Sequence, residues 1–279
     1  MREIPAAELT RIVKDLCLKA NTGLRPDVLE AVRASLAVET SPTGREVLEQ
    51  VLQNAELAAS EKLPICQDTG YVSVFIQLGQ DVWLKGDIAE AINEGVRQAY
   101  AEGFLRKSIV ARPIFGRENT GDNTPAFINI DLVAGDKVKI IVMPKGGGTE
   151  NASRLRMLPV SKDADAVKRF VLEMAENAAK SCPPVIVGVG VGGSFDKVGL
   201  LAKKALLRPL SDKNPDPQLA AFEGELLTEI NNLGIGPAGL GGKVTALGVK
   251  IETMPTHIAC LPAAIAFNCI AARQAEATI

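Results

Sequence analysis

The sequence predicts an α+β fold in which an N-terminal helical layer packs on a mixed β-sheet. Three observations support this prediction. The first sixty residues follow a helical pattern, later apolar runs are rich in β-branched residues, and helices alternate with strands too irregularly for a parallel βαβ series. A hydrophobic content of 47% in 279 residues is enough for the core of one large or two small domains. We interpret residues 1–279 as a single domain that is mainly helical over 1–62.

The N-terminal layer is predicted to contain three helices. Apolar residues recur at helical spacing in the first of them, at Leu9, Ile12, Val13 and Leu16. Two further helices are predicted over 25–38 and 43–60, because each follows a stretch of turn-forming or capping residues. Those stretches are NTGLRPD and TSPTG.

From Tyr71 onward, strand patterns alternate with helical ones. The run YVSVFIQL indicates a strand, and DIAEAINEGVRQAYAEG indicates a helix. In AFINIDLVAGDKVKIIVMPKGGG, two strand-like runs flank an Ala-Gly-Asp turn, which predicts an antiparallel hairpin. The segment DADAVKRFVLEMAENAAKS predicts an amphipathic helix with Asp in its first turn and Lys180 in its last.

The C-terminal part is predicted to add strands and two helices. The apolar run PPVIVGVGVGG indicates a strand, and DKVGLLAKKALL and QLAAFEGELLTEINNL indicate helices. After them, short strand-like runs alternate with Gly and Pro up to the last residues.

Composition excludes several classes of function. A net charge of −2 and an aromatic content of 4% disfavour binding to nucleic acid or to an anionic membrane. The N-terminus is charged where a signal peptide would be apolar, and the apolar runs near 185–193 and 258–267 are too short to span a bilayer. We therefore predict a cytoplasmic protein.

Two glycine clusters leave alternatives open. Gly188, Gly190 and Gly193 have the spacing of a dinucleotide fingerprint between a strand and a helix, but no strand ending in an acidic residue follows about 20 residues later. We favour the interpretation that these glycines allow close packing, or present backbone amides to an anion, over the alternative that they bind NAD in an oxidoreductase. The run Gly146–Gly148 is equally consistent with amides that bind a carboxylate or phosphate and with a flexible turn.

The five cysteines are the discriminating feature. An odd number without an export signal favours reduced thiols, and no close CxxC pair suggests a four-cysteine zinc site. Cys66, Cys182 and Cys269 each stand at a predicted element boundary beside unusual neighbours. Taken singly, each is more often a buried apolar residue, but together they suit a site with three thiolate ligands.

Several motifs in order along essentially the whole chain resemble the class I iron–sulfur hydro-lyases, which include oxygen-sensitive fumarate hydratases and L-tartrate dehydratases. The motifs are CQDTG (66–70), FLRKS (104–108), PKGGG (144–148), SCPP (181–184), the glycine-rich run 189–206, and His257 twelve residues before CIAAR. The chain resembles the alpha subunit of the two-subunit form. Lys107 departs from the family, where larger aromatic residues are common after the arginine.

The resemblance implies a cofactor and its ligands. A [4Fe–4S] cluster would be held by Cys66, Cys182 and Cys269, whereas Cys17 and Cys260 would be structural. The part of the chain from residue 63 to 279 would then bind the cluster and the substrate.

The resemblance also implies site residues. Asp68 would act as an acid on the departing oxygen, and His257 would lie at the edge of the active site. The implied catalytic residues are Asp68 and His257, and the implied substrate-binding residues are Gln67, Asp68, Thr69, Arg106, Gly146, Gly147 and Gly148.

The expected function is that of a fumarate hydratase, which interconverts (S)-malate and fumarate. The alternatives are L-tartrate dehydratase within the same class, an NAD-binding oxidoreductase, and a non-catalytic subunit with a structural metal. Family members made as one polypeptide continue into a second domain that supplies the base, whereas this sequence stops at Ile279. We therefore expect a separate beta subunit, in a heterodimer or heterotetramer, and a small dicarboxylic acid as substrate.

Overall fold

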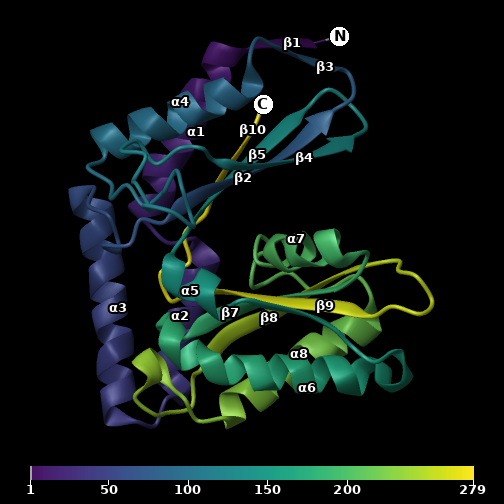
Figure 1. The fold of residues 1–279 in the computed structure, drawn as a ribbon. Coiled ribbons are helices and arrows are strands. Elements are labelled where there is room, and N and C mark those ends of the chain that lie inside the picture. The colour runs from purple at the N-terminus through teal and green to yellow at the C-terminus, as the bar shows by residue number, and fades with distance from the viewer. Residues whose placement is uncertain (1) are drawn as a thin grey trace. The chain divides into compact units, whose positions relative to one another are not determined.

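The computed structural model describes residues 2–279, whose contacts group them into two compact units (Figure 1). Unit 1 combines the N-terminal residues up to Arg25 with Asn54–Gly147 and Arg273–Ile279. Unit 2 combines Pro26–Gln53 with Gly148–Ala272. Both units are therefore built from segments that are distant in the sequence, and the interpretation as a single domain stays a prediction.

Unit 1 is built on a four-stranded sheet. Its elements are β1 (Arg2–Pro5), α1 (Ala6–Asn21), β2 (Tyr71–Gly79), β3 (Val82–Lys85), α4 (Ile88–Glu102), β4 (Phe127–Val133), β5 (Val138–Lys145) and β10 (Ala275–Thr278). The strand order is β10-β5-β2-β4, and β1 and β3 form a separate parallel pair. Helix α1 packs on β5, β10 and α4, and its four apolar residues that predicted the helix are all buried.

The predicted antiparallel hairpin between residues 127 and 145 is wrong. Strands β4 and β5 are not neighbours, because β2 lies between them, parallel to β4 and antiparallel to β5. Strand β2 is buried over most of its length and therefore needs partners on both sides, whereas the largely exposed β4 suits the edge of the sheet.

Unit 2 has a sheet of its own with helices on both faces. Its elements are α2 (Pro26–Val38), β6 (Arg154–Met157), α6 (Asp163–Ala175), β7 (Val185–Gly192), α7 (Phe195–Ala205), α8 (Pro217–Asn232), β8 (Ala246–Met254) and β9 (Pro262–Asn268). The strand order is β6-β9-β7-β8, with β7 parallel to β8 and antiparallel to β9. Helix α7 covers one face, and α6 and α8 cover the other (Figure 1).

The remaining helices connect these elements. Helices α3 (Pro42–Glu61) and α5 (Gly147–Ala152) contain residues of both units, and short 3-10 helices span Val160–Lys162, Glu176–Ser181 and Pro237–Gly239. The predicted helix after residue 163 is therefore α-helical only to Ala175, and Lys180 lies in the 3-10 turn that follows.

The glycine-rich run of β7 serves close packing against α7. A Cβ atom on Gly188 would lie 2.3 Å from the Ala202 carbonyl oxygen, and one on Gly190 would lie 2.4 Å from the Val198 carbonyl oxygen. Any larger residue would therefore force the helix away from the strand. This contact explains the first two glycines of the spacing that resembles a dinucleotide fingerprint, whereas Gly193 has a left-handed backbone with a φ of 69°.

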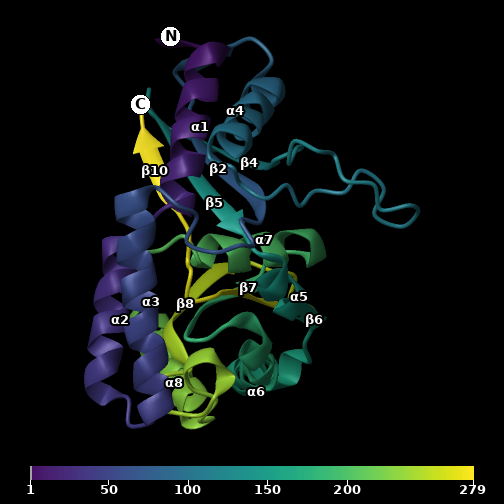
Figure 2. The same ribbon diagram turned by 90° about the vertical axis from the view of Figure 1, so that its left-hand side faces the viewer.

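The mixture of helices and of parallel and antiparallel strands confirms the predicted α+β class. Within residues 2–279, no helix combines the length and the apolar character needed to cross a membrane. A long loop leaves unit 1 between α4 and β4 and projects away from the sheet (Figure 2). A single bridge, between Val110 and Asn119, joins its two limbs.

Candidate functional site

Unit 1 brings two of the predicted motifs to the same end of its sheet. The CQDTG segment directly precedes β2, and the glycine run directly follows β5. Because β2 and β5 are antiparallel and Tyr71 pairs with Lys145, the start of one strand meets the end of the other. Residues separated by about eighty positions are thereby placed side by side.

The Asp68 carboxylate binds backbone amides at this end of the sheet. Gly147 N–H donates to its Oδ2 at 2.8 Å, and Gly70 N–H donates to its Oδ1 at 3.1 Å. Gly146 leaves room for this arrangement, since a Cβ atom there would lie 3.1 Å from Asp68 Oδ2. The glycine run therefore does present an amide to a carboxylate, and in this structure the carboxylate is the chain's own.

The segment that carries Asp68 is tied down from several directions. Gly70 has a φ of 73°, and a Cβ atom on it would lie 2.4 Å from the Lys145 carbonyl oxygen, so only glycine fits. The buried Tyr100 hydroxyl donates to the carbonyl oxygens of Thr69 at 2.8 Å and Gly70 at 3.0 Å. The Thr69 hydroxyl donates to the Arg106 carbonyl oxygen at 2.9 Å, which joins the motif to the start of the projecting loop.

The other predicted residues of unit 1 differ in exposure. Gln67 and Arg106 are exposed, and Cys66 is half-buried with its thiol donating to Gln67 Oε1 at 3.6 Å. Thr69 is only 2% exposed and its hydroxyl is already engaged, so its visible role is to hold Arg106 in place. Gln67 and Arg106 can meet a ligand without rearrangement of the core.

Unit 2 brings Cys182 and Cys269 to one end of its sheet. Cys182 lies just before β7 and Cys269 just after β9, and these strands are antiparallel, with Ile186 opposite Asn268. The Ile270 N–H donates to the Cys182 carbonyl oxygen at 3.1 Å, which joins the two segments directly. Cys182 is exposed and has a left-handed backbone with a φ of 54°.

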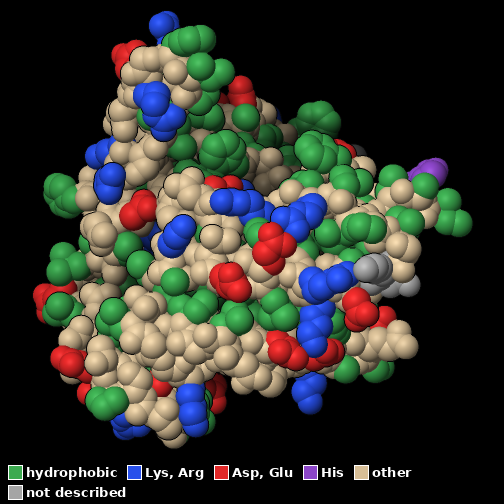
Figure 3. Space-filling view, turned by 60° about the horizontal axis from the view of Figure 1, so that its bottom comes forward, with side chains coloured by type: hydrophobic (Ala, Val, Ile, Leu, Met, Phe, Trp, Pro, Cys, Tyr) green, Lys and Arg blue, Asp and Glu red, His purple; other side chains and the backbone are tan. Residues whose placement is uncertain are grey.

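His257 and Cys260 lie at the opposite end of that sheet. Both belong to the loop from β8 to β9, and the Cys260 N–H donates to the His257 carbonyl oxygen at 2.8 Å. Strand β7 separates the two ends by roughly 25 Å. The single histidine stands on the surface (purple in Figure 3), and unit 2 does not bring it together with Cys182 and Cys269.

The chemistry of the cysteines fits an iron–sulfur cluster. None of the five forms a disulfide, and Cys66, Cys182 and Cys269 are not fully buried, so each thiol is open to a ligand such as iron, which cysteine thiolates hold in these clusters. Burial raises the pKa of the Cys17 thiol, which disfavours the thiolate there. Among residues 2–279, no three His, Cys, Asp or Glu side chains are grouped as a metal site, so the ligand set stays a prediction.

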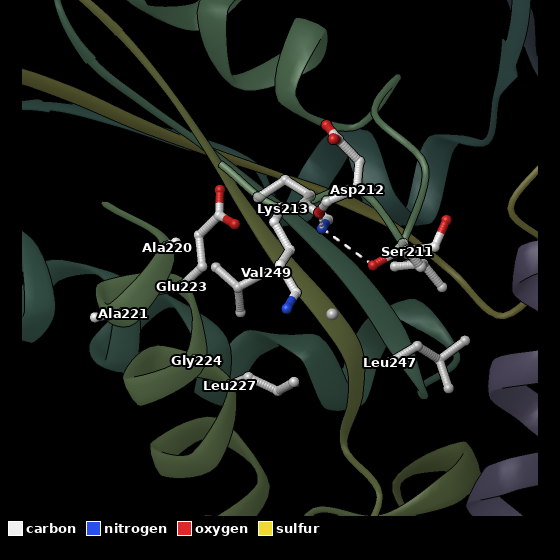
Figure 4. Close-up of a pocket in the computed structure, with 13 residues that line it drawn as sticks. Ser211, Asp212, Lys213, Ala220, Ala221, Glu223, Gly224, Leu227, Leu247 and Val249 are labelled. Carbon is white, nitrogen blue, oxygen red and sulfur yellow. Dashed lines mark hydrogen bonds between the residues drawn. The ribbon is translucent and has the colours of Figure 1, made fainter. Parts of the chain in front are cut away.

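A separate cavity of about 470 Å³ lies in unit 2, between α8 and β8 (Figure 4). Two of its charged groups are bonded to the protein: Lys250 Nζ donates to the carbonyl oxygens of Leu210 and Asp212, and Glu223 Oε1 accepts from the Ile251 N–H. Burial lowers the pKa of the Lys250 ammonium. None of the predicted site residues lines this cavity, which disfavours it as the substrate site.

Sequence reasoning missed the residues that support the Asp68 segment, namely Asn21, Tyr100 and Arg273. Arg273 is part of the CIAAR motif, but the sequence does not show that its guanidinium donates to the Asp68 carbonyl oxygen. Asn21 and Tyr100 belong to helices α1 and α4, and nothing in a helical pattern marks a polar residue that faces a distant loop.

Comparison with known proteins places residues 10–278 in one family. The family model described as "Fumarate hydratase (Fumerase)" matches residues 10–278. A protein of Methanocaldococcus jannaschii named "Putative L(+)-tartrate dehydratase subunit alpha" is 41% identical over 276 residues, which covers 96% of each chain. Proteins named "L(+)-tartrate dehydratase subunit alpha" from Escherichia coli UTI89 and Shigella sonnei are 33% and 32% identical over 272 residues, covering 96% of this chain and 89% of each relative.

Proposed function

The chain belongs to the class I fumarate hydratase and tartrate dehydratase alpha family, and we propose that it is the alpha subunit of an iron–sulfur hydro-lyase acting on a small 2-hydroxy dicarboxylic acid. The observation that carries the proposal is the full-length similarity to relatives named as such subunits. The Asp68 carboxylate, held between glycine amides beside a candidate cluster ligand, is consistent with this function.

The first candidate substrate is L(+)-tartrate. The relatives reported above are named tartrate dehydratase subunits, one of them at 41% identity, and this reverses the order that the sequence alone suggested. Malate and fumarate remain the second candidate pair of substrate and product, because the description of the matching family model names fumarate hydratase.

Both reactions eliminate water across two neighbouring carbons. The C–O bond of a hydroxyl group breaks, the adjacent carbon loses a proton, and the electron pair of that C–H bond forms the double bond. Malate would give fumarate, and tartrate would give an enol that rearranges to oxaloacetate. The reaction therefore needs an acid at one carbon and a base at the other, held in one geometry.

Cys66, Cys182 and Cys269 are the proposed ligands of a [4Fe–4S] cluster. When bound, the cluster would supply a Lewis-acidic iron that has no cysteine ligand. Asp68, two residues after Cys66, is the proposed acid that gives a proton to the departing oxygen. Arg106 would pair with a substrate carboxylate through its planar guanidinium.

The glycine amides and Asp68 are linked in this proposal. A single N–H cannot donate fully to two carboxylates, so substrate binding at Gly147 requires Asp68 to release that amide. Binding would then free Asp68 Oδ2 for proton transfer, while the Gly70 N–H still holds Oδ1. Gln67, Gly146 and Gly148 are the remaining proposed substrate contacts, and Thr69 is proposed to act on substrate binding through the Arg106 backbone that its hydroxyl holds. His257 remains a proposed catalytic residue.

A separate beta subunit is the proposed partner, because the relatives are named alpha subunits. It would supply the base that removes the proton from carbon. The protein is proposed to act in the cytoplasm.

The test is to co-express the chain with its partner subunit, reconstitute the cluster without oxygen, and compare kcat/KM for L(+)-tartrate and (S)-malate. We expect dehydration of both acids to be measurable, with kcat/KM for tartrate higher by at least about tenfold. A site that binds the extra hydroxyl group of tartrate can discriminate by this much. A preference for malate would restore the second candidate. Activity on neither acid would contradict the proposed function.

A further inference from the structure

Arg273 is buried beside the Asp68 segment. Its side chain follows Cys269 by four residues, stands just before β10 and is only 3% exposed. Its Nη1 donates to the Asp68 carbonyl oxygen at 2.6 Å and to Asn21 Oδ1 at 3.3 Å. A buried guanidinium is costly unless its donors are bonded, so these contacts define where it must lie.

Arg273 Nη2 also lies close to Gly146, as does the carboxylate of Asp68. A Cβ atom on Gly146 would lie 3.5 Å from Arg273 Nη2 and 3.1 Å from Asp68 Oδ2, so both groups flank the same glycine. The Nε of Arg273 is buried and has no hydrogen-bond partner. Structural contacts therefore do not use the full donor capacity of this side chain, which is unusual for a buried polar group.

Asn21, at the end of α1, completes the arrangement. It is fully buried, its carbonyl oxygen accepts from the Ile65 N–H at 2.8 Å, and its Nδ2 donates to the Cys17 carbonyl oxygen at 2.9 Å. The segment from Cys66 to Asp68 is thereby fixed on both sides. The backbone carbonyl of Asn21 binds Ile65, which directly precedes this segment, and Arg273 binds the carbonyl oxygen of Asp68, the last residue of the segment.

We infer that Arg273 is a positioning residue that, with Asn21, fixes the Cys66–Asp68 segment so that Asp68 is aligned for proton transfer. The inference rests on the proposed function. Arg273 acts through the Asp68 backbone and does not touch substrate. The alternative is an arginine that only stabilises the core of unit 1.

The test compares Arg273→Gln and Arg273→Lys with Ile92→Ala, a control that removes a fully buried side chain of the core of unit 1. In the assembled enzyme, Arg273→Gln should lower kcat about 10²-fold with KM within about threefold, because a displacement near 1 Å is enough for such a loss. Arg273→Lys should recover part of kcat, since its ammonium keeps one donor. Ile92→Ala should lose stability but keep its kcat.

A second readout does not depend on activity. In the purified chain, amide hydrogen exchange over residues 65–70 should be at least about tenfold faster in Arg273→Gln than in Ile92→Ala. Unchanged exchange there, or an effect on KM alone, would overturn the inference. If the wild-type enzyme dehydrates neither acid, the proposed function fails, and the exchange measurement still decides the positioning role. If Arg273→Gln does not fold, Arg273→Lys gives the same comparison.

Discussion

The cysteines differ in their surroundings, and this predicts different effects of mutation. Cys182 and Cys269 meet at one end of a sheet and Cys66 precedes Asp68, whereas Cys17 is fully buried and Cys260 lies at the far end of β7. After anaerobic reconstitution, we expect about four irons and four sulfides per chain, and replacement of Cys66, Cys182 or Cys269 by Ala should abolish cluster binding. Iron, sulfide and visible absorption measure this outcome.

Cys17→Ala and Cys260→Ala are the matched controls and should keep the cluster. The choice of third ligand would be wrong if Cys269→Ala retained the cluster while Cys260→Ala lost it. Both cysteines are half-buried, so exposure alone does not decide between them. Their positions distinguish them, because Cys269 lies at the end of the sheet that also holds Cys182, and Cys260 lies at the opposite end.

The chemistry of single residues was more predictable than their supporting contacts. Asp68 and the glycine run were found from sequence because their residue types are unusual before and after strands. The bond between Asn21 and Arg273 joins positions 252 apart, and such a contact follows from the fold rather than from any local pattern. For His257, the sequence predicted a place at the edge of the active site. The structure of unit 2 alone does not test this prediction.

Most helices and strands followed their local patterns, although the predicted helix after residue 163 is α-helical only to Ala175, but the predicted strand pairing did not form. The predicted hairpin failed because sequence proximity favoured pairing β4 with β5, whereas the long apolar β2 occupied the position between them. Burial of β2 between two partners removes more apolar surface from water than a hairpin that leaves it at an edge. Pairing is therefore determined by competition between distant strands.

The connection between α2 and α3 is held by one carboxylate. Glu39 is 3% exposed and accepts backbone N–H groups from Thr40, Ser41, Lys243 and Val244, all within unit 2. Burial raises the pKa of this carboxyl group, but the four amides outweigh burial, so its pKa lies below the ordinary 4.5. The charged form is thus the one that the fold stabilises.

We predict that Glu39→Gln destabilises the chain by about 1.5–3 kcal/mol at pH 7, the range for hydrogen bonds to a charged group. Because the folded pKa is lowered, the unfolded chain binds more protons below about pH 4.5, and the contribution of Glu39 is lost as the pH falls through the folded pKa. Urea unfolding should show the difference at pH 7 and its decline in acid. The exposed Glu30 offers a control, since Glu30→Gln should change little, and a pH-independent difference for Glu39→Gln would contradict the argument.

At the scale of the whole molecule, the proposed reaction needs more than the groups found near Asp68. An elimination requires a base as well as an acid, both aligned with the same two carbons. In unit 1 the candidate site offers an acid, an exposed arginine and glycine amides, and in unit 2 His257 lies at the other end of the sheet from Cys182 and Cys269. The relatives are named alpha subunits, which supports a partner as the source of the base.

We therefore predict that the reconstituted chain alone dehydrates neither L(+)-tartrate nor (S)-malate at a useful rate. Addition of the partner subunit should raise turnover by at least about 10²-fold, the smallest effect expected when a missing general base is supplied. Turnover of both acids, measured with equal cluster content in the two samples, tests this directly. The partner alone and the pair carrying Cys66→Ala are the controls, and both should be inactive. Full turnover by the chain alone would mean that its own residues include the base, and His257 would then be the first residue to replace.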